Sequence, residues 1–97
     1  MIFMVTVPQP VSLEIAIRLY YEKSEIGNPD IRKLYGKIST GRIVGLKNLA
    51  RELMIESKCR VWNPVSVNTK LAYKSWGLDI KDLEERYARL KKLERIA

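Results

Sequence analysis

Histidine is missing from this 97-residue chain, and cysteine occurs once, as Cys59. The usual zinc sites need several such side chains, so the chain cannot build one. Nucleophilic pairs of serine or cysteine with histidine are excluded as well. A single cysteine cannot form an internal disulfide, which fits a reducing, intracellular setting. We therefore expect a cytoplasmic protein.

Carboxylate chemistry is the class of catalysis that remains, because the chain has 11 acidic residues. Most of them stand among lysines and arginines, where they suit the surfaces and dipoles of helices. Asp82, Glu84 and Glu85 follow this rule, since they lie at the start of an expected helix. We therefore expect no enzyme, and no cofactor, metal or small-molecule substrate.

Long apolar runs are also missing, and none approaches the roughly 20 residues that a membrane span needs. The opening segment MIFMVTV is apolar, but it is short and has no basic leader. We interpret this segment as a short strand or a packed arm, with the N-terminal arm covering residues 1–10. With 46% hydrophobic and 30% charged residues, the chain has the composition of one small globular domain, residues 1–97, with no membrane partner.

Positive charge is abundant and unevenly placed. The net charge is +7, made up of −2 in residues 1–30, +6 in residues 31–60 and +3 in residues 61–97. A basic patch of this kind favours a polyanionic partner, through phosphate neutralisation and counterion release. Solubility alone is the other explanation for such a charge.

Hydrophobic periodicity and capping signals predict a mainly all-α protein of about five helices. The expected helices cover about 12–24, 29–35, 40–57, 69–76 and 80–96. Their expected N-caps are Ser12, Asn28, Ser39, Asn68 and Asp79. Residues 58–67 break the helical pattern, and a small hairpin near 60–67 or an ordered loop is expected there.

Residues 29–50 carry a more specific pattern. A first helix with the aliphatic residues Ile31 and Leu34 ends at Gly36, and the aliphatic Ile38 follows in the turn. Ser39 then caps a second helix, and the β-branched Ile43 stands four positions after this cap. The segment resembles the helix-turn-helix superfamily of DNA-binding domains. Lys37 makes the turn one residue longer than its commonest form.

The helix expected at 40–57 would be the recognition helix under this resemblance. Its aliphatic side turns inward, so the outer side should carry Gly41, Val44, Gly45, Asn48 and Glu52. Asparagine can pair with an adenine edge, arginine with guanine or phosphate, and the methyl groups of threonine and valine can contact thymine. The expected DNA-binding residues are Ser39, Thr40, Gly41, Arg42, Val44, Lys47, Asn48, Arg51, Lys33, Lys37, Lys58 and Arg60.

A purely structural interpretation of the same helix is also open. Gly41 and Gly45 have the four-residue spacing that brings helices into close contact. Arg42 lies near the aliphatic side, where its stem could shield the core. Asn48 would then be an ordinary solvated residue.

The last expected helix carries an apolar stripe at 3-4-3 spacing, formed by Ile80, Leu83, Tyr87 and Leu90. Two heptads are too short for a coiled coil that is stable alone. The stripe should either pack on its own domain or form a homodimer through residues 80–96. A dimer would suit a palindromic DNA site.

Together these features predict sequence-specific binding of double-stranded DNA, in a small transcriptional regulator or an accessory protein of a mobile element. Two alternatives remain. One is a protein–protein interaction module whose positive charge meets an acidic partner. The other is a DNA-recognition subunit of a larger complex, such as a viral packaging motor.

Overall fold

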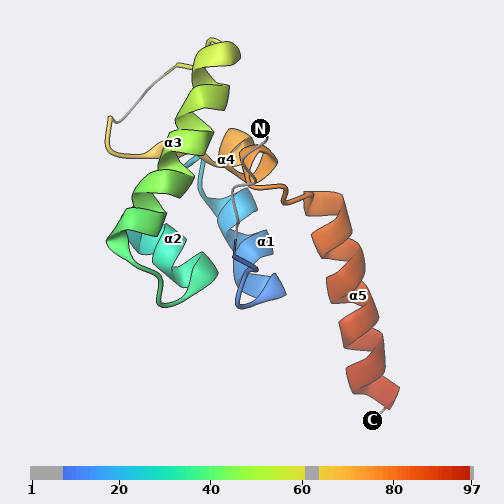
Figure 1. Cartoon of the computed structure of the whole chain (residues 1–97). Helices are drawn as coiled ribbons and strands as arrows, with labels where there is room; N and C mark the ends of the chain where they lie inside the picture. The colour runs from blue at the N-terminus through green and yellow to red at the C-terminus, as the bar shows by residue number, and fades with distance from the viewer. Residues whose placement is uncertain (1–7, 61–63, 97) are drawn as a thin grey trace, which may run out of the picture.

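The protein is described here by a computed structural model covering residues 8–60 and 64–96 (Figure 1). The elements in chain order are α1 (Leu13–Glu22), β1 (Glu25–Ile26), α2 (Asn28–Tyr35), α3 (Thr40–Glu56), β2 (Val67–Asn68), α4 (Thr69–Ser75) and α5 (Ile80–Ile96). The expected mainly all-α architecture is confirmed. Most of the expected N-terminal arm, residues 1–7, lies outside the described residues.

Side-chain caps explain why three helices begin where the sequence predicts. Ser12, Ser39 and Asn68 each accept a hydrogen bond from the backbone N–H three residues later, at 3.3, 3.2 and 3.0 Å. Each bond satisfies a donor that the first helical turn leaves without an intrahelical partner. At the start of α5, the Asp79 carboxylate accepts a bond from the N–H of Lys81 at 3.0 Å.

The start of α2 differs from the prediction by one residue. Gly27, and not Asn28, is the N-cap, because the Asn28 side-chain oxygen accepts a hydrogen bond from the ammonium of Lys47. The Asp30 carboxylate accepts a bond from the N–H of Gly27 at 3.1 Å and forms an ion pair with Lys23 at 2.8 Å. Asp30 therefore stabilises this end of the helix, as its position near the positive end of the dipole predicts.

The small sheet joins segments that are far apart in the sequence. β1 and β2 pair antiparallel, with Glu25 opposite Asn68 and Ile26 opposite Val67. The strand near the expected hairpin therefore pairs with residues 25–26. Ile26 and Val67 are both fully buried, so the pairing also buries apolar surface. The same pairing explains why α1 ends at Glu22, since the chain turns into β1 soon afterwards.

One side of α3 packs into the hydrophobic core, and its other side is exposed. α3 packs mainly on α4, and two aromatic side chains of this region are nearly or fully buried. Tyr73 donates its hydroxyl hydrogen to the Ala16 carbonyl oxygen at 2.6 Å, and Trp76 donates its indole N–H to the Leu46 carbonyl oxygen at 2.8 Å. Both rings therefore bury apolar surface while their polar tips keep a partner. These contacts fix α3 relative to α1 and α4.

α5 begins on the domain and ends away from it. Leu83 is buried where α5 crosses α1, while Leu90 and Leu93 are 42% and 64% exposed. Figure 1 shows the second half of α5 running clear of the other helices. Among residues 8–60 and 64–96, none of the helices combines the length and the apolar character that crossing a membrane requires.

Candidate nucleic-acid interface

The outer surface of α3 is the candidate site. We call Gly41, Val44, Gly45, Asn48 and Glu52 the α3 face. All five are exposed, while Ile43, Leu46 and Ala50 are buried on the opposite side of the helix. Steps of three and four residues along an α-helix return to the same side, which is why the two sets separate.

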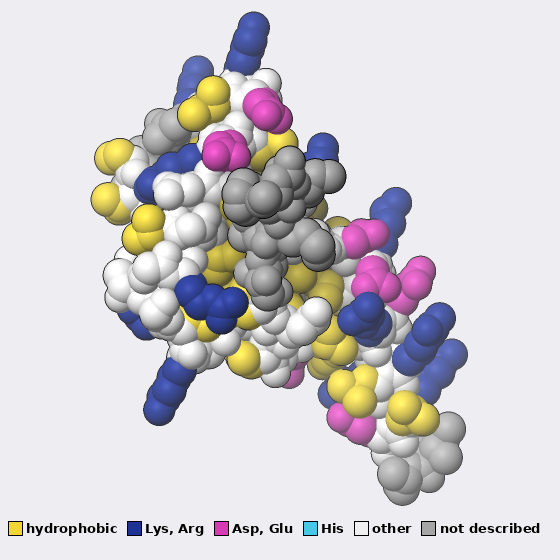
Figure 2. Space-filling view, in the orientation of Figure 1, with side chains coloured by type: hydrophobic (Ala, Val, Ile, Leu, Met, Phe, Trp, Pro, Cys, Tyr) yellow, Lys and Arg dark blue, Asp and Glu magenta, His cyan; other side chains and the backbone are white. Residues whose placement is uncertain are grey.

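Because Gly41 and Gly45 have no side chains, the backbone of α3 is accessible at two positions of the α3 face. Apart from the adjacent residues and the backbone of α3 itself, a Cβ atom added at Gly45 would meet no heavy atom within 4 Å, and at Gly41 the nearest would be the Ser39 hydroxyl oxygen at 3.9 Å. The glycines therefore do not serve close packing within the described part of this chain. Figure 2 shows the surface along the first half of α3 as largely white, because backbone and uncharged side chains form it.

The start of α3 is tied to α2 by an arginine. Arg32 donates hydrogen bonds to the Ile38 carbonyl oxygen at 3.3 Å and to the Thr40 hydroxyl at 3.5 Å. Its guanidinium therefore lies at the N-terminal end of α3, where the helix dipole is positive. Arg32 was not among the expected binding residues, since only the folded turn between the two helices shows this contact.

Several cations surround this end of α3. Residues 31–51 contain six lysines and arginines and no acidic residue. Four of the six, Arg32, Lys33, Lys37 and Arg42, have exposed side chains. Ser39 and Thr40 are exposed at the same end, although the Ser39 oxygen already accepts the N–H of Arg42. This end of α3 therefore combines positive charge with an open surface.

Lys47, expected among the DNA-contacting cations, is instead turned inward. It is 9% exposed, and its ammonium donates hydrogen bonds to the Asn28 side-chain oxygen at 3.0 Å and to the Val65 carbonyl oxygen at 2.6 Å. Burial, with a smaller contribution from the Arg51 guanidinium, lowers the pKa of Lys47. Lys47 therefore ties α3 to α2 and to the segment before β2, and it is left out of the candidate interface.

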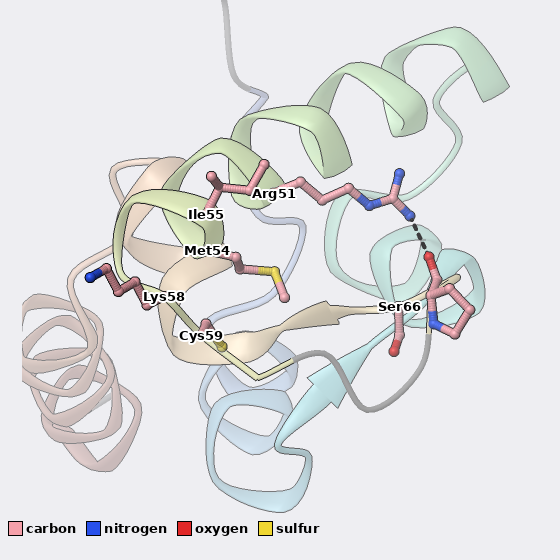
Figure 3. Close-up of a pocket in the computed structure, with 7 residues that line it drawn as sticks. Arg51, Met54, Ile55, Lys58, Cys59 and Ser66 are labelled. Atoms are coloured by element: carbon pink, nitrogen blue, oxygen red, sulfur yellow. Dashed lines mark hydrogen bonds between the residues drawn. The ribbon is translucent and has the colours of Figure 1, made fainter.

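Arg51 is also engaged within the fold. It is half-buried and donates a hydrogen bond to the Pro64 carbonyl oxygen at 3.0 Å, as Figure 3 shows. Beneath it lies a cavity of about 230 Å³ between the second half of α3 and residues 64–66, lined in part by Met54 and Cys59. Arg51 therefore braces this segment, and only part of its surface remains open to a ligand.

Lys58 and Arg60 lie at the other end of α3. Both are exposed, but a 17-residue helix is about 25 Å long, and they follow its last turn. Lys58 adopts a left-handed backbone conformation, with φ of 53°, which turns the chain away from the helix axis. The expected binding residues therefore divide into one group at the start of α3 and a separate pair beyond its end.

Replacing Lys47 by methionine is expected to loosen the segment before β2. The variant keeps the aliphatic stem but loses both hydrogen bonds of the ammonium, at a cost of about 1.4 kcal/mol. Amide hydrogens of residues 65–68 should then exchange about tenfold faster, as measured by hydrogen exchange with mass spectrometry. The matched control is Lys37→Met, which changes an exposed lysine on the turn. Unchanged exchange in the Lys47 variant would contradict the bracing role.

No protein-family model, curated protein or solved structure matches this chain. Within residues 8–60 and 64–96, no cluster of three or more acidic or cysteine side chains could hold a metal ion. The features of the molecule that bear on its function are therefore the α3 face, the charges around it and the shape of the domain.

Proposed function

We propose that the chain binds double-stranded DNA by placing the first half of α3 in the major groove. The observation that carries this proposal is the open α3 face, with two exposed glycines and four exposed cations near the same end of the helix. The major groove, about 12 Å wide, admits an α-helix, and a helix without side chains at two positions can approach the groove wall closely.

Three side chains of α3 are suited to reading bases. Thr40, Val44 and Asn48 are exposed and follow one another at four-residue steps, so they line one side of the helix. Asn48 would form two hydrogen bonds with an adenine edge, and the methyl groups of Thr40 and Val44 would contact thymine methyl groups. This arrangement favours sites rich in A·T pairs under the first half of α3.

The cations around the start of α3 would contact phosphates. Arg32, Lys33, Lys37 and Arg42 come from α2, the turn and the first turn of α3, which is how helix-turn-helix proteins flank their second helix with backbone contacts. Such contacts position a protein without reading sequence. The activity would be occupancy of a site, as in a small transcriptional regulator or an accessory protein of a mobile element.

The salt dependence of duplex binding tests this proposal. We expect micromolar affinity for a fluorescent random-sequence duplex at about 100 mM salt, measured by anisotropy. The logarithm of the binding constant should fall with the logarithm of the salt concentration, with a slope of about −3 to −4 for four phosphate contacts. The double variant Lys37→Ala/Arg42→Ala should bring the slope closer to zero by about two.

The matched control is Lys70→Ala/Lys74→Ala, which removes two exposed lysines from α4. The buried side of α3 packs on α4, so these lysines stand away from the α3 face, and the control should keep the slope of the native chain. Equal slopes for the two double variants would place DNA contact elsewhere. If the chain does not bind duplex DNA at about 50 mM salt, the proposal is wrong, and a protein–protein interaction module becomes the better explanation of the basic surface.

A further inference from the structure

The cavity beneath Arg51 has an apolar interior and reaches the surface. Its volume is about 230 Å³, and its walls include Met54 of α3, Cys59 beyond the end of this helix, and Pro64. Ile55 also lines the cavity and is 77% exposed, so a ligand can enter from solvent. An engineered apolar cavity of about 150 Å³ takes up benzene. The present cavity is therefore large enough for one aromatic ring with a short polar arm.

Hydrogen bonds hold two walls of this cavity in place. Met54 is 4% exposed, and its sulfur accepts the backbone N–H of Asn68 at 3.5 Å. The N–H of Cys59 donates to the Met54 carbonyl oxygen at 2.9 Å, where the chain leaves α3. Two sulfur-containing side chains therefore line the cavity on a fixed framework, and methionine sulfur makes favourable contacts with aromatic rings. The cavity is thus largely pre-formed, as binding sites for small molecules usually are.

Arg51 supplies a positive charge at the edge of the cavity. Its guanidinium is half-buried and has five N–H donors, of which one bonds to the Pro64 carbonyl oxygen at 3.0 Å (Figure 3). Of the acids that the structure describes, none forms an ion pair with Arg51 and none lines the cavity. Arginine binds carboxylates through two parallel hydrogen bonds. A carboxylate on the ligand would supply the partner that Arg51 lacks among these residues.

We propose that this cavity binds a small aromatic carboxylate, with its ring beside Met54 and Cys59 and its carboxylate on the guanidinium of Arg51. The volume limits the ligand to about one ring, the sulfur atoms favour an aromatic one, and Arg51 selects an anion. Lys58 also lines the cavity, but Figure 3 shows its ammonium pointing away from Met54 and Cys59. The site does not depend on DNA binding, because none of the residues that line it belongs to the α3 face.

The reactivity of Cys59, the single cysteine of the chain, tests the proposal. Its side chain lines the cavity, so a bound ligand should shield the thiol from iodoacetamide, which is uncharged. The probe is phenylacetate, and for a ligand of about ten non-hydrogen atoms we expect a dissociation constant on the order of 1 mM. At about 10 mM, phenylacetate should therefore slow alkylation of the full chain about tenfold by mass action.

Two related compounds separate the ring from the charge. Phenylacetamide has the same ring without the negative charge, and acetate has the charge without the ring. Each at about 10 mM should slow alkylation less than about twofold, because each satisfies only one half of the site. The proposal is overturned if phenylacetate does not slow alkylation, or if either of these compounds shields Cys59 as well as phenylacetate does.

Arg51→Met and Lys58→Met form a matched pair, since each removes one positive charge from the lining of the cavity. Arg51→Met should weaken phenylacetate binding at least about tenfold, and Lys58→Met less than about threefold. Arg51→Lys retains the charge without the planar fork, so its affinity should lie between those of the native chain and Arg51→Met. Each variant is measured with and without ligand, and circular dichroism checks its fold. Equal shielding in the native chain and in a folded Arg51 variant would overturn the assigned role of Arg51.

Discussion

Replacing Gly45 with glutamate is expected to weaken duplex binding at least about 100-fold while leaving the domain folded. Gly45 lies in the middle of the α3 face, and apart from its adjacent residues and the backbone of α3 itself no heavy atom stands within 4 Å of the position a Cβ would take. A carboxylate there would meet the phosphates and the electronegative groove, and like charges brought together cost several kcal/mol. Anisotropy titration at constant salt measures the loss, and thermal unfolding confirms the fold.

Gly45→Ala is the matched control, and it should separate stability from binding. Alanine is the better helix former and has open space at this position, so the free energy of unfolding should rise by about 0.5–1 kcal/mol. The added methyl group prevents the backbone of α3 from approaching the groove as closely as in the native chain, so the affinity for duplex DNA should fall modestly. If both substitutions leave duplex affinity unchanged, α3 does not enter the groove by this surface.

Replacing Trp76 with alanine is expected to lower the free energy of unfolding by about 4 kcal/mol, enough to unfold much of a marginally stable domain. The indole is 4% exposed and packs edge-on against Tyr35, with ring centroids 5.6 Å apart. It also donates its N–H to the Leu46 carbonyl oxygen in α3. Urea unfolding followed by circular dichroism measures the loss.

Trp76→Phe separates the indole hydrogen bond from the ring. Phenylalanine retains most of the buried apolar surface but leaves the N–H position empty, so we expect a smaller loss of about 1–2 kcal/mol. A loss as large as that of the alanine variant would mean that the hydrogen bond to Leu46, and not packing, dominates. A negligible loss in both variants would contradict the position of Trp76 in the core.

Helix positions follow from signals that lie within a few residues of one another. Ser39 and Asn68 cap helices that begin one residue later, as predicted, because the cap bonds a backbone N–H only three residues away. Gly36, with φ of 77°, ends α2 where glycine tolerates a conformation that other residues avoid. Periodicity likewise predicts that Gly41 and Gly45 face outward, since Ile43 and Leu46 turn to the core.

The hydrogen-bond partners of the individual lysine and arginine side chains could not be predicted from nearby residues in the sequence. Lys47 and Arg51 look like surface cations in the sequence, yet their partners, Val65 and Pro64, stand 18 and 13 residues further along the chain. Arg32, unremarkable within α2, reaches the start of α3 across the turn. Periodicity reports which side of a helix is apolar, but it contains no information about which distant carbonyl oxygen a long side chain will meet.

For α5 the sequence predicts an amphipathic helix but not how much of its stripe the domain covers. Leu83 and Leu90 belong to the same apolar stripe, yet one is buried and the other exposed. The difference depends on where α5 crosses α1, which is set by the packing of the whole domain.

The sequence by itself determined the five helices, most of their ends, the concentration of positive charge after residue 30 and the outward position of the α3 glycines. All of these depend on short-range backbone geometry and on counting charges. Only the tertiary structure decided that Lys47 is withdrawn into the fold, that Arg32 joins the start of α3 and that α5 ends uncovered. Those outcomes depend on contacts between segments far apart in the chain, whose relative positions exist only once the core has formed.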